Sequence, residues 1–185
     1  MERLRPETTV LLVVDVQERL CAAMPPDALA RLLANAKILV EAARVVGARL
    51  LVSEQYPKGL GPTHPDLAAK LAELGVQPID KLTFDASSEP RIAHALAASD
   101  PRAVVVVGME AHVCVYQTAR ELVTRGYATY VVADAVTSRR EENRLAGLAL
   151  CTSAGAITTT TEAVVFDWVE RAGTDAFRQI SKLVR

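Results

Sequence analysis

The stretch Ala103-Val-Val-Val-Val-Gly-Met-Glu-Ala-His-Val-Cys114 joins a run of valines to a glycine and then to a cysteine. Because residues 103–107 are apolar without alternation, they are predicted to form a strand that is buried on both faces of a sheet. Gly108 is expected to end this strand, and a helix is expected from near His112 to Arg125. Cys114 would then lie in the first turn of a helix, beside the carboxyl end of a buried strand.

The same alternation of apolar strand and amphipathic helix extends over the rest of the chain. Ser138 and Glu141 are expected to form a capping box for one of the helices. The pattern predicts an α/β fold, in which one doubly wound, six-stranded parallel sheet carries helices on both faces and residues 1–185 form a single domain. Strands are expected at residues 10–14, 49–53, 78–81, 103–107, 127–132 and 156–160, and other helices at 27–46, 67–74, 90–98 and from about 162.

Polar or flexible residues follow several of these strands directly. In open parallel sheets, ligands bind at the carboxyl ends of the strands, beside a switch in strand order. The residues at these ends can therefore converge in space despite their wide separation in the sequence. They are Asp15, Ser53, Lys81, Gly108 and Asp134.

Cys114 is the candidate nucleophile among them. Free N–H groups and the helix dipole at the start of a helix lower the pKa of a thiol and supply hydrogen-bond donors for an oxyanion. The alternative is that Cys114 is a small core residue, since free cysteines are usually buried and inert.

Asp15 and Lys81 each have two interpretations. Asp15 could cap a short helix that starts at Val16, or it could be the general base for a thiol. Lys81 could be a solvated surface residue, or its ammonium could hold the Asp15 carboxylate charged and stabilise a thiolate. Together with Cys114, the two residues form a chemically coherent set.

The composition favours a small-molecule substrate. The chain has 21 basic and 22 acidic residues, no basic run and only 4% aromatic residues, so nucleic acid is an unfavourable partner. No apolar run approaches the roughly 20 residues that cross a bilayer, and the N-terminal residues lack the apolar region of a signal peptide. Three separated cysteines without a CxxC motif suit a reducing compartment, so a cytoplasmic location is expected.

Two other classes of protein compete with an enzyme that uses a cysteine nucleophile. A nucleotide-binding or flavodoxin-like protein is disfavoured because no G-x-G-x-x-G follows Val14 and no GK[ST] loop occurs. A catalytically silent interaction protein with the same fold stays an alternative, because intact residues do not prove turnover.

Four segments in order make the resemblance to a known family specific. The chain resembles the isochorismatase-like cysteine hydrolase superfamily, which also contains nicotinamidases and N-carbamoylsarcosine amidases. It is most similar to the isochorismatase-domain-containing subgroup, which shares the loop at residues 53–63. The matching segments are Leu11-Leu-Val-Val-Asp-Val-Gln17, Lys81-Leu-Thr-Phe84, Val105-Val-Val-Gly-Met-Glu-Ala-His-Val-Cys-Val115, and Gly126 through Val132-Ala-Asp-Ala135.

The resemblance implies a three-layer, Rossmann-like fold and a catalytic triad of Asp15, Lys81 and Cys114. It also implies a cis peptide bond between Met109 and Glu110, which would turn the N–H of Glu110 toward that of Cys114 to form an oxyanion hole. The implied mechanism is attack by the Cys114 thiolate on a carbonyl, followed by hydrolysis of the acyl-enzyme. Homo-oligomers, either dimers or tetramers, are implied as well.

One departure from the family patterns bears on metal and substrate. Nicotinamidases carry an Asp-x-His metal motif where this chain has Ser53-Glu-Gln55, and Glu54 with His64 is a poor ligand set for zinc. We therefore expect neither a catalytic metal nor another cofactor. Isochorismatases proper, which cleave a vinyl ether, typically lack the cysteine, so its presence here favours amidase-type chemistry.

Further residues beside the triad are expected to line a substrate pocket. The loop at residues 54–65 is long and rich in glycine and proline, which is typical of functional loops. For Phe84 and Tyr116, core packing is the alternative, and His112 is expected to point away from the thiol. The expected pocket residues are Gln17, Tyr56, Phe84, His112 and Tyr116.

Overall fold

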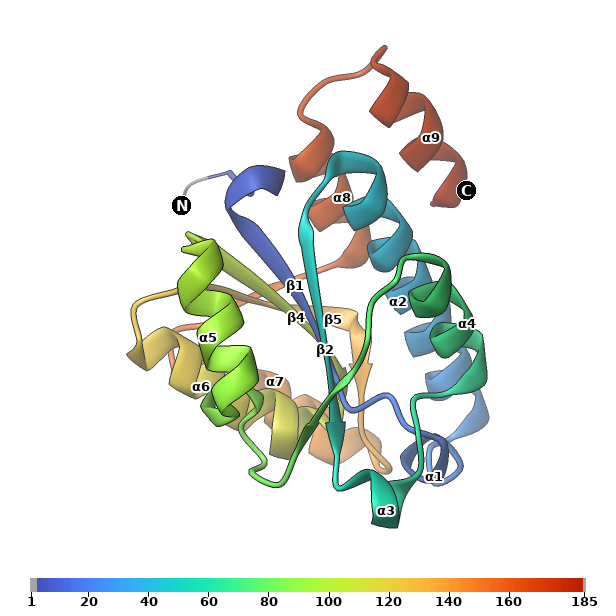
Figure 1. Ribbon diagram of the computed structural model, residues 1–185. Helices are drawn as coiled ribbons and strands as arrows, with labels where there is room; N and C mark the ends of the chain where they lie inside the picture. The colour runs from blue at the N-terminus through green and yellow to red at the C-terminus, as the bar shows by residue number, and fades with distance from the viewer. Residues whose placement is uncertain (1–2, 185) are drawn as a thin grey trace.

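In the computed structural model, which describes residues 3–184, six strands form one parallel sheet (Figure 1). Their order across the sheet is β3-β2-β1-β4-β5-β6, and every neighbouring pair is parallel. The prediction of a six-stranded parallel α/β fold is therefore confirmed. The strands are β1 (Thr9–Val14), β2 (Arg49–Gln55), β3 (Ile79–Lys81), β4 (Ala103–Met109), β5 (Ala128–Thr137) and β6 (Ile157–Thr159).

The strand order reverses between β1 and β4. From β1 the chain moves outward through β2 to β3, and it then returns to the other side of β1 and continues through β4, β5 and β6. Parallel strands that diverge in this way leave a crevice at their carboxyl ends. The last residues of β1 and β4, Val14 and Met109, border this crevice.

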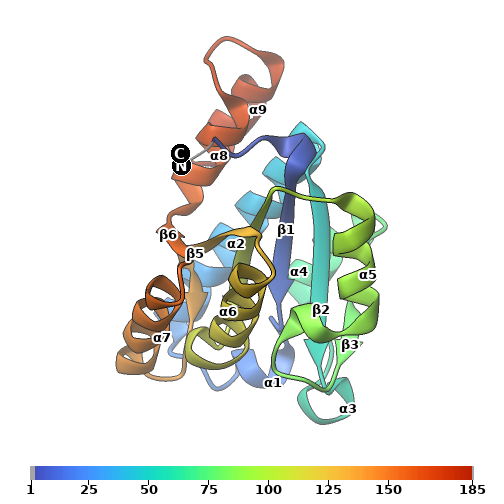
Figure 2. The same ribbon diagram turned by 90° about the vertical axis from the view of Figure 1, so that its left-hand side faces the viewer.

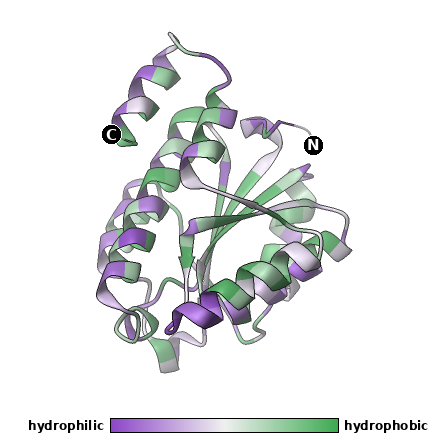
Figure 3. Ribbon diagram, turned by 180° about the vertical axis from the view of Figure 1, so that it is seen from behind, coloured by the Kyte–Doolittle hydropathy of each residue, from purple (hydrophilic) through white to green (hydrophobic). Residues whose placement is uncertain are grey.

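Helices cover both faces of the sheet, and each face has its own apolar core (Figure 2). Residues of α2, α4, α8 and α9 pack on the face that includes Leu11 and Val13 of β1. Residues of α5, α6 and α7 pack on the opposite face, which includes Leu12 and Val14. In Figure 3 the strands are mostly hydrophobic along their length, whereas the helices alternate between hydrophobic and hydrophilic residues. The helices are α1 (Glu18–Cys21), α2 (Pro26–Val46), α3 (Pro57–Leu60), α4 (Pro65–Glu73), α5 (Pro90–Ser99), α6 (Tyr116–Thr124), α7 (Glu141–Ser153), α8 (Thr161–Val169) and α9 (Asp175–Leu183).

Two strands are longer than their sequences predicted. β4 continues through Gly108, which does not end it but adopts a φ of 118°. β5 continues past Asp134 to Thr137, and the pairing register with β4 shifts between Val106 and Gly108. The central strands thus reach further toward the crevice than their apolar runs indicated.

The predicted capping box at the start of α7 is wrong. This helix begins at Glu141, and its N-cap residue is Arg140, which makes no side-chain capping bond. Ser138 is buried instead, and its hydroxyl lies 3.1 Å from Nδ1 of His112. Ser138 therefore links the end of β5 to the turn that carries Cys114.

Asp134 does not join the other strand-end residues. Its Oδ1 accepts hydrogen bonds at 2.9 Å from both the N–H and the hydroxyl of Thr161, at the start of α8. Because β5 runs past this residue, Asp134 lies within the strand and serves the packing of α8, so its expected place in the site is wrong.

The helices of residues 3–184 include none with the length and hydrophobicity that a membrane span requires.

Candidate active site

Asp15 and Lys81 form a buried ion pair at the carboxyl ends of β1 and β3. Oδ2 of Asp15 lies 2.7 Å from Nζ of Lys81, and both side chains are fully buried. The two charges also act on the thiol of Cys114, since Asp15 raises its pKa and Lys81 lowers it. The structure thus brings together the three residues that the sequence placed at separate strand ends.

The Cys114 thiol is less acidic than the sequence predicted. Burial first, and the Asp15 carboxylate next, raise its pKa to about 12, and the Lys81 ammonium opposes the effect of Asp15 only in part. The pKa of the thiol therefore lies above its ordinary value, whereas the helix start had suggested a lower one, because loss of solvent disfavours the thiolate. A thiol of this kind is neutral at physiological pH and needs an adjacent base before it can attack.

The backbone at Asp15 turns its carboxylate toward the crevice. Asp15 has a φ of 53°, a left-handed conformation that aspartate tolerates better than most residues. Its N–H donates to the carbonyl of Ser53 at 3.1 Å, and the Ser53 hydroxyl donates to Asp15 Oδ1 at 2.7 Å. The N-cap residue of α1 is Gln17, so the interpretation of Asp15 as a helix cap is wrong.

Lys81 is surrounded by neutral acceptors. Its ammonium donates to Gln55 Oε1 at 2.6 Å and to the carbonyls of Thr83 and Phe84 at 3.1 and 3.2 Å. Asp15 Oδ2 lies 2.7 Å from Nζ of Lys81, which makes the ion pair. Among residues 3–184, however, this oxygen accepts no directed hydrogen bond. A lone pair of this oxygen is therefore left for another proton.

The turn before Cys114 contains the expected cis peptide bond between Met109 and Glu110. A π-helix, Ala111–Val115, follows this bond, and the Glu110 carbonyl accepts from the N–H groups of Val113 and Val115. In an α-helix the Glu110 carbonyl would accept from the N–H of Cys114. Here it accepts from the residues on either side of Cys114 instead. Such local widening of a helix is frequent at functional sites.

Two side chains tie this turn to the loop before α7. The Glu110 carboxylate accepts from the backbone N–H of Arg139 at 3.0 Å and from its Nε at 3.1 Å. His112 contacts Ser138, as described above, so its Nδ1 has a partner in the segment before α7. Both contacts hold the backbone whose N–H groups would form an oxyanion hole.

The five expected pocket residues have different surroundings. Tyr56 and Phe84 are each 52% exposed, so core packing does not apply to Phe84. Tyr116 is half-buried, with the Arg120 guanidinium 5.2 Å from the centre of its ring. Gln17 is buried, and its amide binds backbone atoms of Gln55 and Gly61, which holds the loop after β2.

A cavity of about 470 Å³ opens beside Lys81. Tyr56, Leu82 and Thr83 contribute to its wall, and Leu82 is 75% exposed. Cys114 does not line this cavity and is 5% exposed. The thiol is thus almost fully covered, while the open space beside Lys81 lies toward β3.

The two candidate metal ligands have other partners. Glu54 is buried and accepts from the N–H and the hydroxyl of Thr63, both at 2.6 Å. His64 caps α4 by accepting from the N–H of Asp66. No cluster of three or more potential His, Cys, Asp or Glu ligands occurs within residues 3–184.

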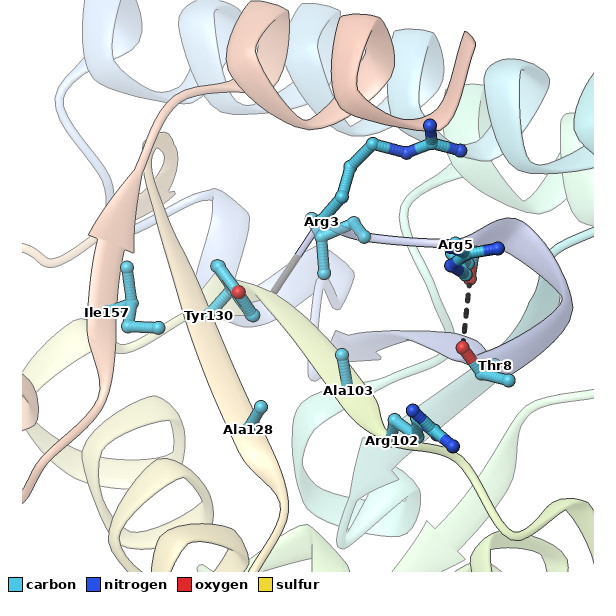
Figure 4. Close-up of a pocket in the computed structure, with 9 residues that line it drawn as sticks. Arg3, Arg5, Thr8, Arg102, Ala103, Ala128, Tyr130 and Ile157 are labelled. Carbon is cyan, nitrogen blue, oxygen red and sulfur yellow. Dashed lines mark hydrogen bonds between the residues drawn. The ribbon is translucent and has the colours of Figure 1, made fainter. Parts of the chain in front are cut away.

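Another cavity, of about 200 Å³, lies at the amino end of the sheet (Figure 4). Arg3, Arg5 and Arg102 contribute to its wall, and Arg3 forms an ion pair with Glu170. Since Asp15, Lys81 and Cys114 follow the carboxyl ends of the strands, this cavity is not part of the candidate active site.

Sequence reasoning missed the part that Gln55 plays. It took Ser53-Glu-Gln55 only as the place of an absent metal motif, whereas the structure puts Gln55 against Lys81. A signal was present, because residues two apart on a strand share a face and Ser53 was already placed at the strand end.

Gly147 of α7 packs directly on the Cys114 turn, and Gly147→Ala is expected to disturb it. A Cβ at this position would lie 2.5 Å from the carbonyl carbon of Ala111 and 2.6 Å from the nitrogen of His112. We expect the free energy of unfolding to fall by about 1–3 kcal/mol, as for other overpacked sites. Helix propensity alone would instead raise it by roughly 1 kcal/mol. Chemical denaturation checks the sign.

The control for this substitution is Leu145→Ala, at a 54% exposed position of the same helix. A Gly147→Ala variant that is more stable than the wild type would contradict the close packing of α7 on the turn.

A doubly wound parallel sheet, with a carboxylate, an ammonium and a thiol buried at its switch point, places the chain among the three-layer α/β proteins. More specifically, the chain belongs to the isochorismatase family, because residues 9–163 match the model described as Isochorismatase domain. The resemblance inferred from the sequence motifs is thus confirmed.

Similar proteins come from animals and microorganisms. Isochorismatase domain-containing protein 2 of Danio rerio is 35% identical, over 98% of this chain and 89% of the relative. The Homo sapiens protein of the same name is 32% identical, over 99% of this chain and 86% of the relative.

Solved structures share the fold. A Caenorhabditis elegans structure described as MAR1 ribonuclease is 36% identical and has a TM-score of 0.91, over 99% of this chain and 92% of that one. Escherichia coli YcaC, described as an octameric hydrolase of unknown specificity, is 20% identical and has a TM-score of 0.85, over 98% of this chain and 90% of that one.

Proposed function

We propose that this chain is a single-domain cysteine hydrolase that cleaves a C–N amide-type bond of a small molecule. The observation that carries the proposal is the buried pair of Asp15 and Lys81, whose charges both act on the Cys114 thiol. A neutral thiol beside a carboxylate with a free lone pair is an arrangement for general-base activation of a nucleophile.

In the first half of the reaction the thiol is acylated. Asp15 Oδ2 takes the proton of the thiol as Sγ forms a bond to the carbonyl carbon. The N–H groups of Glu110 and Cys114 stabilise the oxyanion of the tetrahedral intermediate. The C–N bond then breaks, and the amine leaves with the proton that Asp15 accepted.

In the second half, water hydrolyses the thioester. Asp15 takes a proton from the water as the water oxygen attacks the acyl carbon. The Sγ–C bond then breaks to release the carboxylic acid. The proton returns to Sγ, so the enzyme is regenerated without a cofactor or a metal. The Lys81 ammonium compensates the negative charge that Asp15 carries before each proton transfer, and Gln17, Tyr56, Phe84, His112 and Tyr116 shape the pocket.

Other functions within the family have their own support. The name of the 36% identical Caenorhabditis elegans structure favours RNA cleavage as a second candidate. The near balance of 21 basic and 22 acidic residues argues against it, since RNA binding draws on clustered positive charge. An isochorismatase-type hydrolase of another small substrate, or an interaction protein without turnover, are further alternatives.

The assembly and location follow the same reasoning. The octameric Escherichia coli protein supports homo-oligomers, and we propose a dimer or tetramer for this chain. The mass of the particle in solution, from light scattering, tests this.

Three free cysteines agree with a reducing compartment, so we propose a cytoplasmic protein with a small-molecule substrate and no nucleic-acid or membrane partner.

A panel of small amides, ureides and carbamoyl compounds, with a labelled RNA as one more sample, tests the function. We expect turnover of a small C–N substrate and an acyl adduct on the peptide that contains Cys114, measured by mass spectrometry. Cys114→Ala should abolish both, while Cys151→Ala, which removes another buried cysteine, should leave them unchanged.

An adduct on another residue, or full turnover by Cys114→Ala, would contradict the proposal. Cleavage of the RNA that depends on Cys114 would favour the ribonuclease alternative instead.

A further inference from the structure

The carboxyl end of β2 lies between the two charged members of the site. β2 pairs with β1, which leads into Asp15, and with β3, which ends at Lys81. Because side chains alternate along a strand, Ser53 and Gln55 face the same side and Glu54 faces the other. Their contacts follow this alternation, since Ser53 and Gln55 bind the ion pair and Glu54 binds Thr63.

Ser53 engages one oxygen of the Asp15 carboxylate. Its hydroxyl donates to Oδ1 at 2.7 Å, and the Ser53 side chain is completely buried. The other oxygen, Oδ2, faces Lys81 at 2.7 Å and accepts no directed hydrogen bond from the described residues. Ser53 therefore distinguishes the two oxygens and leaves Oδ2 as the proton acceptor.

Gln55 engages the Lys81 ammonium in a fixed orientation. Its Nε2 donates to the carbonyl of Leu82 at 2.8 Å, so the amide must turn its Oε1 toward Lys81, 2.6 Å away. Its backbone N–H donates to Gln17 Oε1 at 2.7 Å, which holds the residue from the other side.

The three N–H groups of Lys81 are fewer than the acceptors around them, because the Cys114 thiol and Asp15 Oδ2 also contact the ammonium. The N–H groups meet the oxygens of Gln55, Thr83 and Phe84, which carry no net charge. If Gln55 offered no acceptor, one of these N–H groups could turn to Oδ2 of Asp15, which lies 2.7 Å from Nζ. That hydrogen bond would occupy the lone pair that the thiol proton needs.

We propose that Ser53 and Gln55 are positioning residues that keep Asp15 Oδ2 open as the proton acceptor for Cys114. Ser53 orients the Asp15 carboxylate. Gln55 accepts an N–H of Lys81 that could otherwise point at this carboxylate, while the positive charge of Lys81 stays close to Asp15. This inference rests on the proposed cysteine hydrolase function.

p-Nitrophenyl acetate is a suitable probe because its two half-reactions are observed separately. In acylation the Cys114 proton moves to Asp15, an Sγ–acetyl bond forms and p-nitrophenolate leaves as a coloured burst. Asp15 then loses this proton to the solvent. In deacylation Asp15 takes a proton from water as the water oxygen attacks the acetyl carbon, the Sγ–C bond breaks to release acetic acid, and Asp15 returns the proton to Sγ. The amplitude of the burst counts competent sites, and its rate constant reports proton transfer within each site.

Gln55→Met and Ser53→Ala are expected to slow the burst on the order of 100-fold, which is the effect of a small misplacement of reacting groups. The burst amplitude per folded chain and the concentration of ester that gives half the maximal rate should stay the same. Ser53→Thr keeps the hydroxyl and should restore most of the rate. Glu54→Gln is the matched control, because it lies on the other face of β2 and should keep the wild-type rate.

Unchanged burst rate constants in both Gln55→Met and Ser53→Ala, beside a Cys114-dependent burst in the wild type, would overturn the inference and leave the proposed function intact. A loss of amplitude alone, at an unchanged rate constant, would also overturn it, since it indicates only misfolded chains. If the wild type shows no acetyl group on Cys114, the proposed function itself fails.

Discussion

Asp15→Asn is expected to remove almost all turnover while making the Cys114 thiol more acidic. The amide of asparagine cannot accept the thiol proton, so we expect catalysis to fall by about 10²- to 10⁴-fold, the usual contribution of a general base. Turnover should fall although the thiol becomes more acidic. Loss of a residue that only stabilises the thiolate would instead make the thiol less acidic, so this combination identifies a base.

The sign of the pKa change follows from the charges that face Cys114. The pKa of the thiol is raised first by burial and next by Asp15, whereas Lys81 lowers it. Without the carboxylate charge only burial and the Lys81 ammonium act on the thiol, so the pKa of Cys114 must fall from about 12. The buried ammonium of Lys81 then lacks a counterion, and a thiolate at Cys114 supplies one. We expect a decrease of roughly two pH units or more.

Thiolate absorbance in the ultraviolet measures this change when it is recorded against a matching Cys114→Ser variant. The control is Asp134→Asn, because Asp134 binds Thr161 away from the thiol and its substitution should leave the titration unchanged. A Cys114 pKa in Asp15→Asn that equals or exceeds the wild-type value would show that the carboxylate does not face the thiol.

The fold could be predicted because its strands are short, apolar and buried on both faces. Residues 103–107 illustrate this, since each of them is buried in β4. Strand ends were harder, because they depend on partners that the sequence does not reveal. β5 reaches Thr137 because it pairs with the extended end of β4, and no local signal marks that pairing.

The members of the site were predictable to the extent that topology determines them. Asp15 follows β1 and Lys81 ends β3, and the two residues meet at the carboxyl end of the parallel sheet. The acidity of Cys114 was not predictable, because the helix start was visible in the sequence but the burial of the thiol was not. The part of Gln55 was hidden for a similar reason, since its acceptor role depends on the orientation of an amide that Leu82 fixes.

Gly108→Ala is expected to have the largest effect on stability of any single substitution in the site. A Cβ at this position would lie 2.0 Å from the carbonyl oxygen of Val14 and 2.8 Å from its nitrogen. The φ of 118° is also one that L side chains rarely adopt. Because both obstacles are backbone and lie in the middle of the sheet, we expect a loss of at least about 4 kcal/mol in the free energy of unfolding.

Gly47→Ala separates the two causes of this loss. Gly47 ends α2 with a φ of 77°, but nothing lies within 4 Å of a Cβ built there. It therefore measures the conformational cost alone, about 1–2 kcal/mol. Denaturant unfolding of both variants should show the much larger loss in Gly108→Ala, and equal losses would contradict the close approach of β1 and β4. That approach matters for the chemistry, because Val14 precedes Asp15, and Gly108 is the next-to-last residue of the strand that leads into the turn to Cys114. The absence of one side chain thus lets the base and the nucleophile meet.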